Sequence, residues 1–373
     1  MPGFSNRSTF EHRPNAWSAR VAEARASGAT LLDLTESNPT RCDLLPSELN
    51  ASNGQDGPVV YQAEPTGLHS AREAVSAYYK DMGVSVSPEQ IVLTASTSEA
   101  YSLIFKLLLN PGESILIPRP SYPLFDFLAQ LESVQAVHYR AMDAASLEAG
   151  LIAGPRAALI VHPNNPTGDY VPETFRTAIL DALAESNGSL IADEVFYDYC
   201  RSGEATPSFA GCDDILCFTL SGLSKVCGLP GHKCSWIVVS GPEPQKQAAL
   251  SRLECMGDTY LSVSASVQHA LPALLAQRHG FQHAVRTRIQ TNWDTLRAHI
   301  DTTEPTQGGW SAVVRLPPGS DDERMAIEVL EKHQVLVHPG YLFDYETHDR
   351  WVLSLLPKPT LFSQAVERLK SAL

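Results

Sequence analysis

Short runs of apolar residues recur through the middle of the chain and alternate with stretches of helical periodicity. Five of these runs are nearly continuous in apolar residues, at positions 114–118, 157–162, 189–193, 215–220 and 235–240. Strands buried on both faces read in this way, whereas half-exposed strands alternate apolar and polar positions. The pattern predicts an α/β fold in which helices cover both faces of a mainly parallel sheet.

The pattern changes after about residue 270. A long helix is expected over residues 270–300, then a strand at 308–316, a helix at 325–333 and strands at 335–340 and 350–356. This part is expected to form a smaller α+β domain.

The length of 373 residues also favours two domains, because it exceeds the size at which one hydrophobic core stops growing. We expect residues 1–45 to form an N-terminal arm and part of the small domain. Residues 46–265 would form the large domain, and residues 266–373 the small C-terminal domain.

Composition and charge narrow the possible partners. Apolar residues make up 43% of the chain, and the formal net charge is −14. Such a charge argues against nucleic acid or an anionic membrane surface as a partner. Neither a signal peptide nor a stretch of membrane-spanning length is recognisable. We therefore expect a cytoplasmic protein.

The seven cysteines form an odd set without a C-x-x-C pair, and the twelve histidines show no metal-ligand spacing. Reduced thiols fit this pattern better than a disulfide framework or a zinc site. No bound metal is expected.

Lys225 is the first candidate for chemistry, because small residues surround it and leave room for a flat ring. A lysine that forms a Schiff base must lose its proton near neutral pH. Desolvation and a neighbouring cation both favour the neutral amine. Taken alone, Lys225 would be read as a surface lysine after a strand, but three other segments change that interpretation.

Two of these segments follow predicted strands, where open α/β sheets bind ligands. In H-P-N-N-P-T-G, the prolines and glycine form a rigid turn that leaves Asn165 free to donate a hydrogen bond. The run 189–193 ends in Asp193, followed by Glu194, and a carboxylate there can hold a protonated pyridine nitrogen. By themselves, these segments could equally be a plain turn and a helix cap or solvated acid.

The third segment, residues 92–109, reads as a strand, a Ser/Thr-rich turn and a helix. Backbone amides at a helix start attract phosphate, so Thr97 and Ser98 are candidate phosphate ligands. A plain N-cap is the alternative. Lysine, acid, amide and phosphate cup together describe one ligand, pyridoxal 5'-phosphate.

With these motifs in this order along nearly its whole length, the chain resembles the class I/II aminotransferases. These are aspartate-aminotransferase-like, fold-type-I pyridoxal-phosphate enzymes. The resemblance implies that Lys225 holds the cofactor as a Schiff base and moves the substrate's Cα proton. It also implies that Asp193 pairs with the pyridine nitrogen, Asn165 with the phenolic oxygen, and Tyr122 with the ring face. Ser224 is expected to contact the cofactor as well.

The same resemblance implies a homodimer with shared active sites. Tyr61 opens a segment similar to the one whose tyrosine reaches the phosphate of the neighbouring subunit. Lys233 stands where most members place a phosphate-binding arginine. Lysine supplies the positive charge there, but it cannot make the two parallel hydrogen bonds that an arginine makes to a phosphate.

Two departures from the family pattern bear on the ring and the substrate. Phe196, followed by Tyr197, stands where the family usually has a tyrosine that hydrogen-bonds the phenolic oxygen. Val352 stands where the family has an arginine that clamps the substrate α-carboxylate, so a bidentate anchor is missing.

Five residues are candidates for substrate contacts: Asn38, Arg41, Trp310, Arg315 and Arg350. The three arginines are cations that could replace the missing clamp, and the other two fall in segments that line the pocket in relatives. Solvated or structural arginines and simple packing are the alternatives.

These features predict a pyridoxal-phosphate-dependent aminotransferase that moves an amino group between a small amino acid or amine and a keto acid. The missing arginine leaves open a lyase, decarboxylase or oxidase that applies the same quinonoid chemistry to an amino acid. A cofactor-binding transcription regulator is disfavoured, since neither an additional domain nor a basic helix-turn-helix is recognisable.

Overall fold

The computed structural model describes residues 22–23, 26–27, 61–201, 203, 205–371 and 373. A seven-stranded sheet lies at its centre, in the order β1-β7-β6-β5-β4-β2-β3. Its strands are β1 (Ile91–Thr94), β2 (Ser114–Arg119), β3 (Gln135–Arg140), β4 (Ala157–Val161), β5 (Ser189–Asp193), β6 (Cys217–Gly222) and β7 (Ser235–Ser240). All are parallel except β7, which runs antiparallel to both neighbours, β6 and β1. The predicted mainly parallel sheet is confirmed, and each of the five apolar runs overlaps one of its strands.

Helices cover both faces of this sheet, and β4 shows why its residues are apolar throughout. Leu159 packs in one core with helices α3, α4 and α8, whereas Ala158 and Ile160 pack in another with α5 and α6. These helices are α3 (Thr97–Leu108), α4 (Phe125–Leu131), α5 (Ala144–Leu151), α6 (Glu173–Glu185) and α8 (Glu243–Tyr260). Successive strand residues point to opposite faces, so a strand covered on both sides needs apolar residues at every position.

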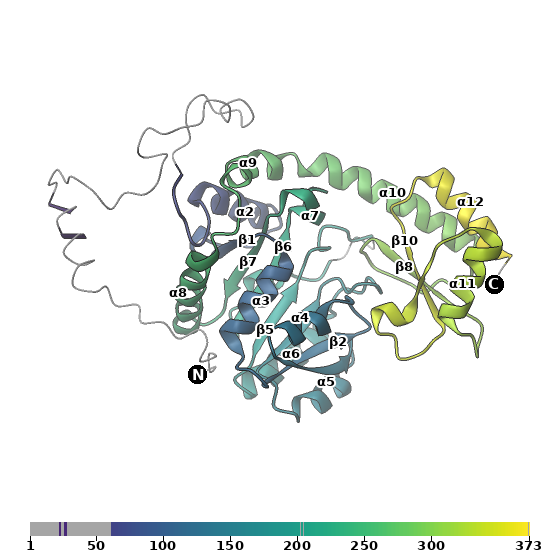
Figure 1. Cartoon of the computed structure of the whole chain (residues 1–373), viewed down its shortest axis with the longest axis horizontal. Helices are drawn as coiled ribbons and strands as arrows, with labels where there is room; N and C mark the ends of the chain where they lie inside the picture. The colour runs from purple at the N-terminus through teal and green to yellow at the C-terminus, as the bar shows by residue number, and fades with distance from the viewer. Residues whose placement is uncertain (1–21, 24–25, 28–60, 202, 204, 372) are drawn as a thin grey trace.

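A three-stranded antiparallel sheet forms the core of the smaller part, in the order β8-β10-β9. Its elements are β8 (Ser311–Arg315), β9 (His338–Pro339), β10 (Arg350–Ser354), α11 (Asp322–His333) and α12 (Pro359–Lys370). Trp351 and Leu353 of β10 pack in one core with residues of α10 (Arg278–His299), α11 and α12. In Figure 1, α10 extends from α9, beside the large sheet, to α12, beside the small sheet.

The single long helix expected over residues 270–300 is in fact two helices, α9 (Ala265–Ala276) and α10. They meet at Gln277, which keeps right-handed helical geometry, so the sequence carries no stop signal between them. Leu271 and Leu275 of α9 pack in the same core as α2 (His69–Asp81), beside β1 and β7. Thus α9 covers the large sheet, while α10 leads to the small one.

The expected domain boundary at residues 265 and 266 stays a prediction, as does the arm over residues 1–45, which lies almost wholly outside the described residues. In the described part of the chain, no helix has both the length and the apolar character to cross a membrane. The same residues contain no group of three or more His, Cys, Asp or Glu able to hold a metal ion.

Asn292 gives a test of how α10 is attached to the small sheet. This buried side chain donates from Nδ2 to the carbonyls of Leu355, at 2.8 Å, and Pro357, at 2.7 Å. Replacing Asn292 by Ala leaves both carbonyls without this donor, and we expect a loss of about 2–4 kcal/mol in the free energy of unfolding. Urea unfolding measures it. Gln290→Ala, an exposed amide on the same helix, is the control and should change stability by less than about 0.5 kcal/mol; equal losses in the two variants would contradict the assignment.

Candidate active site

Three neighbouring parallel strands bring the predicted site together at their carboxyl ends. Val161 of β4 pairs in register with Asp193 of β5, which pairs with Leu220 of β6. The loops that follow carry Asn165 and Lys225. Because the carboxyl ends of parallel strands lie at one edge of the sheet, these loops meet where such folds bind ligands.

Asp193 lies on the α3 side of the sheet, as alternation along β5 from the core residue Ile191 requires. Tyr101 of α3 donates its hydroxyl to Asp193 Oδ2 at 2.6 Å, and the Val195 amide donates to Oδ1 at 3.1 Å. Burial raises the pKa of Asp193 above its ordinary value, while these two hydrogen bonds and Lys225 oppose that shift. Two donors hold the carboxylate in place, and its oxygens retain lone pairs for a further donor.

The neighbouring acid, Glu194, points to the other face of the sheet. Its carboxylate accepts from Ser208 Oγ at 2.6 Å and from the Phe209 amide at 2.7 Å. Burial raises the pKa of Glu194 to about 7. The structure thus separates two acids that stand side by side in the sequence, and only Asp193 lies on the side of Tyr101.

Lys225 lies on α7 (Leu223–Val226), a single helical turn after β6. Its Nζ lies 4.9 Å from the centre of the Trp310 ring and 5.3 Å from that of Phe196. Burial lowers the pKa of Lys225, and the charge of Asp193 opposes this. The expected neighbouring cation is therefore not what shifts this amine: burial has that effect, with two aromatic faces in contact.

An aromatic cluster encloses the Lys225 amine. Trp310 packs edge-on against Phe196, at 5.4 Å between ring centres, and against Tyr199, at 5.0 Å. The indole Nε1 of Trp310 is buried and has no hydrogen-bond partner in the described structure. Phe196, where a tyrosine was the family expectation, presents a ring face to the amine instead of a hydroxyl.

Two adjacent asparagines in the turn after β4 have different surroundings. Asn164 is buried and structural, since its Nδ2 donates to the Pro120 carbonyl and to Thr167 Oγ1, both at 3.1 Å. Ser121 Oγ donates to its Oδ1 at 3.3 Å, which ties the loop after β2 to the loop after β4. Asn165 is half-buried, and its amide makes no hydrogen bond to the described residues.

Tyr122 and the start of α3 complete this edge of the sheet. Tyr122 is half-buried against Phe125, at 5.4 Å between ring centres, and burial and the charge of Asp193 raise its pKa. Thr97 and Ser98 are the first two residues of α3, which is capped by the preceding serine. Amides in a first helical turn have no intrahelical partner, so this end can hold an anion.

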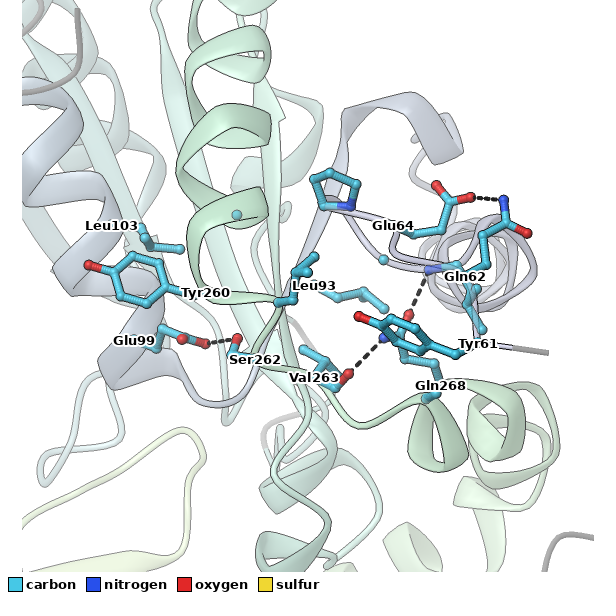
Figure 2. A pocket seen from close by; sticks show the side chains of 16 residues that line it. Tyr61, Gln62, Glu64, Leu93, Glu99, Leu103, Tyr260, Ser262, Val263 and Gln268 are labelled. Carbon is cyan, nitrogen blue, oxygen red and sulfur yellow. Dashed lines mark hydrogen bonds between the residues drawn. The ribbon is translucent and has the colours of Figure 1, made fainter. Parts of the chain in front are cut away.

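Three further residues were predicted to contact the cofactor. Tyr61 is 42% exposed and lines a small pocket between the ends of α3, α8 and α9 (Figure 2). Neither Lys225 nor Asp193 belongs to the described lining of that pocket. Lys233 is exposed and has a left-handed backbone, and Ser224 is half-buried beside Lys225. The roles of these three residues stay predictions.

The predicted substrate cations of the small sheet are already ion-paired. Arg350 Nε lies 2.7 Å from Glu304 Oε1, and Arg315 Nη2 lies 3.2 Å from the same oxygen. Val352 is buried and faces Val313 across the sheet. Of the other candidates, Trp310 lies at the site, and Asn38 and Arg41 fall outside the described residues.

Sequence reasoning missed the partner that holds the acid, Tyr101. The signal was available, because Tyr101 lies four residues after Thr97 and therefore on the same side of the helix. It also missed Tyr199, whose hydroxyl donates to the Lys225 carbonyl at 2.5 Å. That contact joins segments 26 residues apart, and no local pattern announces it.

The described residues fit pyridoxal 5'-phosphate. Trp310 Nε1 is a buried polar atom without a partner in the described structure, which is rare unless a ligand or water completes it. Asp193 keeps acceptor capacity, Lys225 has a lowered pKa, and the α3 start offers amides to a phosphate. When bound, the cofactor supplies an electron sink for the carbon that carries the amino group.

The sheet, the amine and the buried acid together define a fold-type-I pyridoxal-phosphate enzyme. The chain belongs to the family described as aminotransferase class I and II, whose model matches residues 36–361. It is therefore a pyridoxal-phosphate-dependent aminotransferase.

Its curated relatives carry aminotransferase names. The glutamate-pyruvate aminotransferase AlaA of Haemophilus influenzae is 25% identical over 324 residues, which cover 81% of this chain and 80% of that protein. The alanine aminotransferase of Mycobacterium tuberculosis is 26% identical over 329 residues, 82% of this chain and 76% of that protein. Human tyrosine aminotransferase is 26% identical over 351 residues, with coverages of 87% and 77%.

Solved structures support the fold. Alanine aminotransferase from Pyrococcus furiosus superposes with a TM-score of 0.76 at 24% identity, covering 83% of each chain. A double mutant of Thermus thermophilus aspartate aminotransferase gives a TM-score of 0.75 at 20% identity, covering all of both chains.

The hydrogen bond from Tyr101 to Asp193 predicts a pH effect. Tyr101→Phe removes a donor that lowers the pKa of Asp193, so that pKa rises further. An acid with a higher pKa is protonated at higher pH, so the acid limb of the kcat profile should move toward neutral, by about 1 pH unit. Steady-state rates of the holoenzyme across pH measure this.

The control is Tyr139→Phe. Tyr139 is also buried and donates its hydroxyl to the Leu159 carbonyl at 2.8 Å, in the core on the opposite face of the sheet. This variant should keep the wild-type acid limb. An unmoved limb in Tyr101→Phe would show that Asp193 ionisation does not set it.

Proposed function

We propose that this aminotransferase moves the amino group of a small amino acid to a keto acid, with Lys225 as its catalytic lysine. The observation that carries the proposal is the half-buried Lys225 amine against Trp310 and Phe196, with Asp193 acting on it through its charge. Alanine and glutamate are the first donors to try, because relatives named for alanine, glutamate and pyruvate cover about four-fifths of the chain.

Each predicted residue has a distinct task in this proposal. Lys225 would accept the Cα proton of the substrate when its amine is neutral. It would then return a proton to the carbon that receives the amino group. Asp193, held by Tyr101, stabilises positive charge on the ring nitrogen of the cofactor. Asn165 donates to the phenolic oxygen, and Tyr122 covers one ring face.

The phosphate site combines the amides of a helix start with side chains. Thr97 and Ser98 would bind the phosphate at the start of α3, together with Ser224 and the charge of Lys233. Tyr61 would serve the phosphate of a second subunit, and its exposure away from the described Lys225 cluster supports that arrangement.

We therefore infer a homodimer with shared active sites that works in the cytoplasm. Cys212, Cys217, Cys227 and Cys234 are free thiols in the described part of the chain, as reduced thiols are in that compartment. A small amino donor and a keto acid would be its partners.

The function is tested by offering alanine, glutamate, aspartate and tyrosine to the holoenzyme with pyruvate or 2-oxoglutarate. Mass spectrometry identifies the products, and the visible spectrum follows the cofactor. We expect a keto acid from alanine or glutamate and the matching amino acid from the acceptor. Release of ammonia, carbon dioxide or peroxide without a new amino acid would refute amino transfer.

Lys225→Ala tests the catalytic lysine. Without an amine at this position, the visible band of lysine-bound cofactor should disappear, and turnover should fall by at least about 10³-fold. The control is Lys246→Ala, which removes a lysine that is ion-paired to Glu243 at 2.7 Å on α8. Wild-type spectrum and rate are expected there. A retained band in Lys225→Ala would move the role to another lysine.

Val352→Arg tests the missing carboxylate clamp. A guanidinium at this position can pair with a carboxylate through two hydrogen bonds, so KM for amino acids should fall by about 10-fold or more. Val352→Met adds length without charge and should leave KM within about 2-fold of wild type. Unchanged KM in a folded Val352→Arg enzyme would mean that the substrate carboxylate lies elsewhere.

A further inference from the structure

Lys225 lies on a helical turn that is too short to satisfy its own main-chain carbonyls. A helix leaves its last four carbonyls without intrahelical partners, and α7 has only four residues. Leu223 O accepts from the amides of Cys227 and Leu229. The Val226 carbonyl accepts from Gln282 Nε2 at 3.2 Å, and the Lys225 carbonyl accepts from the Tyr199 hydroxyl at 2.5 Å. The main chain at Lys225 is therefore positioned from outside its own helix.

Tyr199 is itself held by contacts on several sides. It is fully buried, and its amide donates to the Phe196 carbonyl at 3.0 Å. Its carbonyl accepts from the Gly309 amide at 3.1 Å, on the segment that leads into β8. Its ring packs edge-on against Trp310, which in turn covers the Lys225 amine. The Tyr199 side chain thus contacts the main chain of Lys225 directly, and it also packs against the Trp310 ring that lies near the Lys225 Nζ.

The neighbouring residues make this position rigid. Tyr78 Oη donates to Asp198 Oδ2 at 3.0 Å, and Arg286 of α10 donates to the Asp198 carbonyl at 3.0 Å. On the other side, a Cβ added to Gly308 would lie 2.7 Å from the Tyr199 carbonyl oxygen, so only glycine allows this approach. The Tyr199 backbone is therefore fixed by α2, α10 and the segment before β8, and its hydroxyl has little freedom to move.

We propose that Tyr199 is a positioning residue for the amino-transfer reaction. It holds the Lys225 main chain through its hydroxyl and sets Trp310 against the lysine amine through its ring. This inference rests on the proposed role of Lys225 and adds a residue that touches neither cofactor nor substrate.

Loss of the Tyr199 hydroxyl should change the position of Lys225, because the Lys225 carbonyl loses its hydrogen-bond donor. Removing the Tyr199 hydroxyl leaves the Lys225 carbonyl without its donor in a buried setting, so the turn shifts or admits water. A reacting group misplaced by about 1 Å loses about 100-fold in rate, because proton transfer depends steeply on geometry. The proton transfers made by Lys225 should therefore slow, while substrate affinity should not change.

Tyr199→Phe is the test, and Tyr170→Phe is its matched control. Tyr170 is also buried, and its hydroxyl donates at 2.7 Å to the carbonyl of Tyr197, two residues before Tyr199. Each variant removes one oxygen atom that donates to a main-chain carbonyl of this site. Only the Tyr199 hydroxyl contacts Lys225.

Three measurements on the holoenzyme separate positioning from stability. They are kcat and KM, the primary isotope effect with a donor deuterated at Cα, and the pH midpoint of the visible band of lysine-bound cofactor. In Tyr199→Phe we expect kcat to fall by about 10- to 100-fold with KM within about 2-fold. The isotope effect should rise, and the pH midpoint should move by about half a unit or more. Tyr170→Phe should keep the wild-type isotope effect and pH midpoint.

The alternative outcomes are decisive. Equal changes in both variants, or a folded Tyr199→Phe enzyme with wild-type isotope effect and pH midpoint, would overturn the proposal. If Tyr199→Phe fails to fold while Tyr170→Phe folds, the hydroxyl is structural and the proposal is also overturned. A visible band that persists in Lys225→Ala would instead refute the lysine assignment, independently of Tyr199.

Discussion

The register of three parallel strands is the constraint on which the site depends. Because Val161, Asp193 and Leu220 lie side by side, the acid at the end of β5 lies between the loop that carries Asn165 and the helical turn that carries Lys225. A register shift by one residue would turn Asp193 toward the face that now holds Glu194. The apolar residues that fix the register by packing on both faces therefore also select the acid that faces α3.

Burial then gives these groups their chemical character, and neighbouring groups limit its effect. Desolvation raises the pKa of Asp193 and lowers that of Lys225, whereas the attraction between the two opposes both shifts. Tyr101 adds a hydrogen bond that favours the charged acid, and the aromatic faces around Lys225 also favour its charged form. The result is an amine that loses its proton more readily than an exposed lysine. The rise in the pKa of the nearby acid is limited by its hydrogen bonds and by Lys225.

Five strands of the large sheet were predictable from the sequence because they are buried on both faces and read as nearly continuous apolar runs. The edge strand β3 is partly exposed and carries no such run. The break at Gln277 was not predictable, since that residue keeps helical geometry and the two helices differ only in the cores they join. At the site, Asp193 and Lys225 follow from local motifs. Tyr101 lies 92 residues from Asp193, and only its helical spacing to Thr97 points to the site. Tyr199 contacts the Lys225 carbonyl across 26 residues, and no local pattern predicts that contact.

Two of the aromatic residues after Asp193, Phe196 and Tyr199, surround Lys225 where the chain departs from its family pattern. Phe196 cannot offer a hydroxyl to the ring, but the centre of its ring lies 5.3 Å from the Lys225 amine. Three residues later, Tyr199 does offer a hydroxyl, and directs it to the lysine main chain. Trp310 packs against both rings, so the segment before β8 contacts the amine through one indole. Any movement of the small sheet that shifts Trp310 must therefore change the surroundings of the lysine proton.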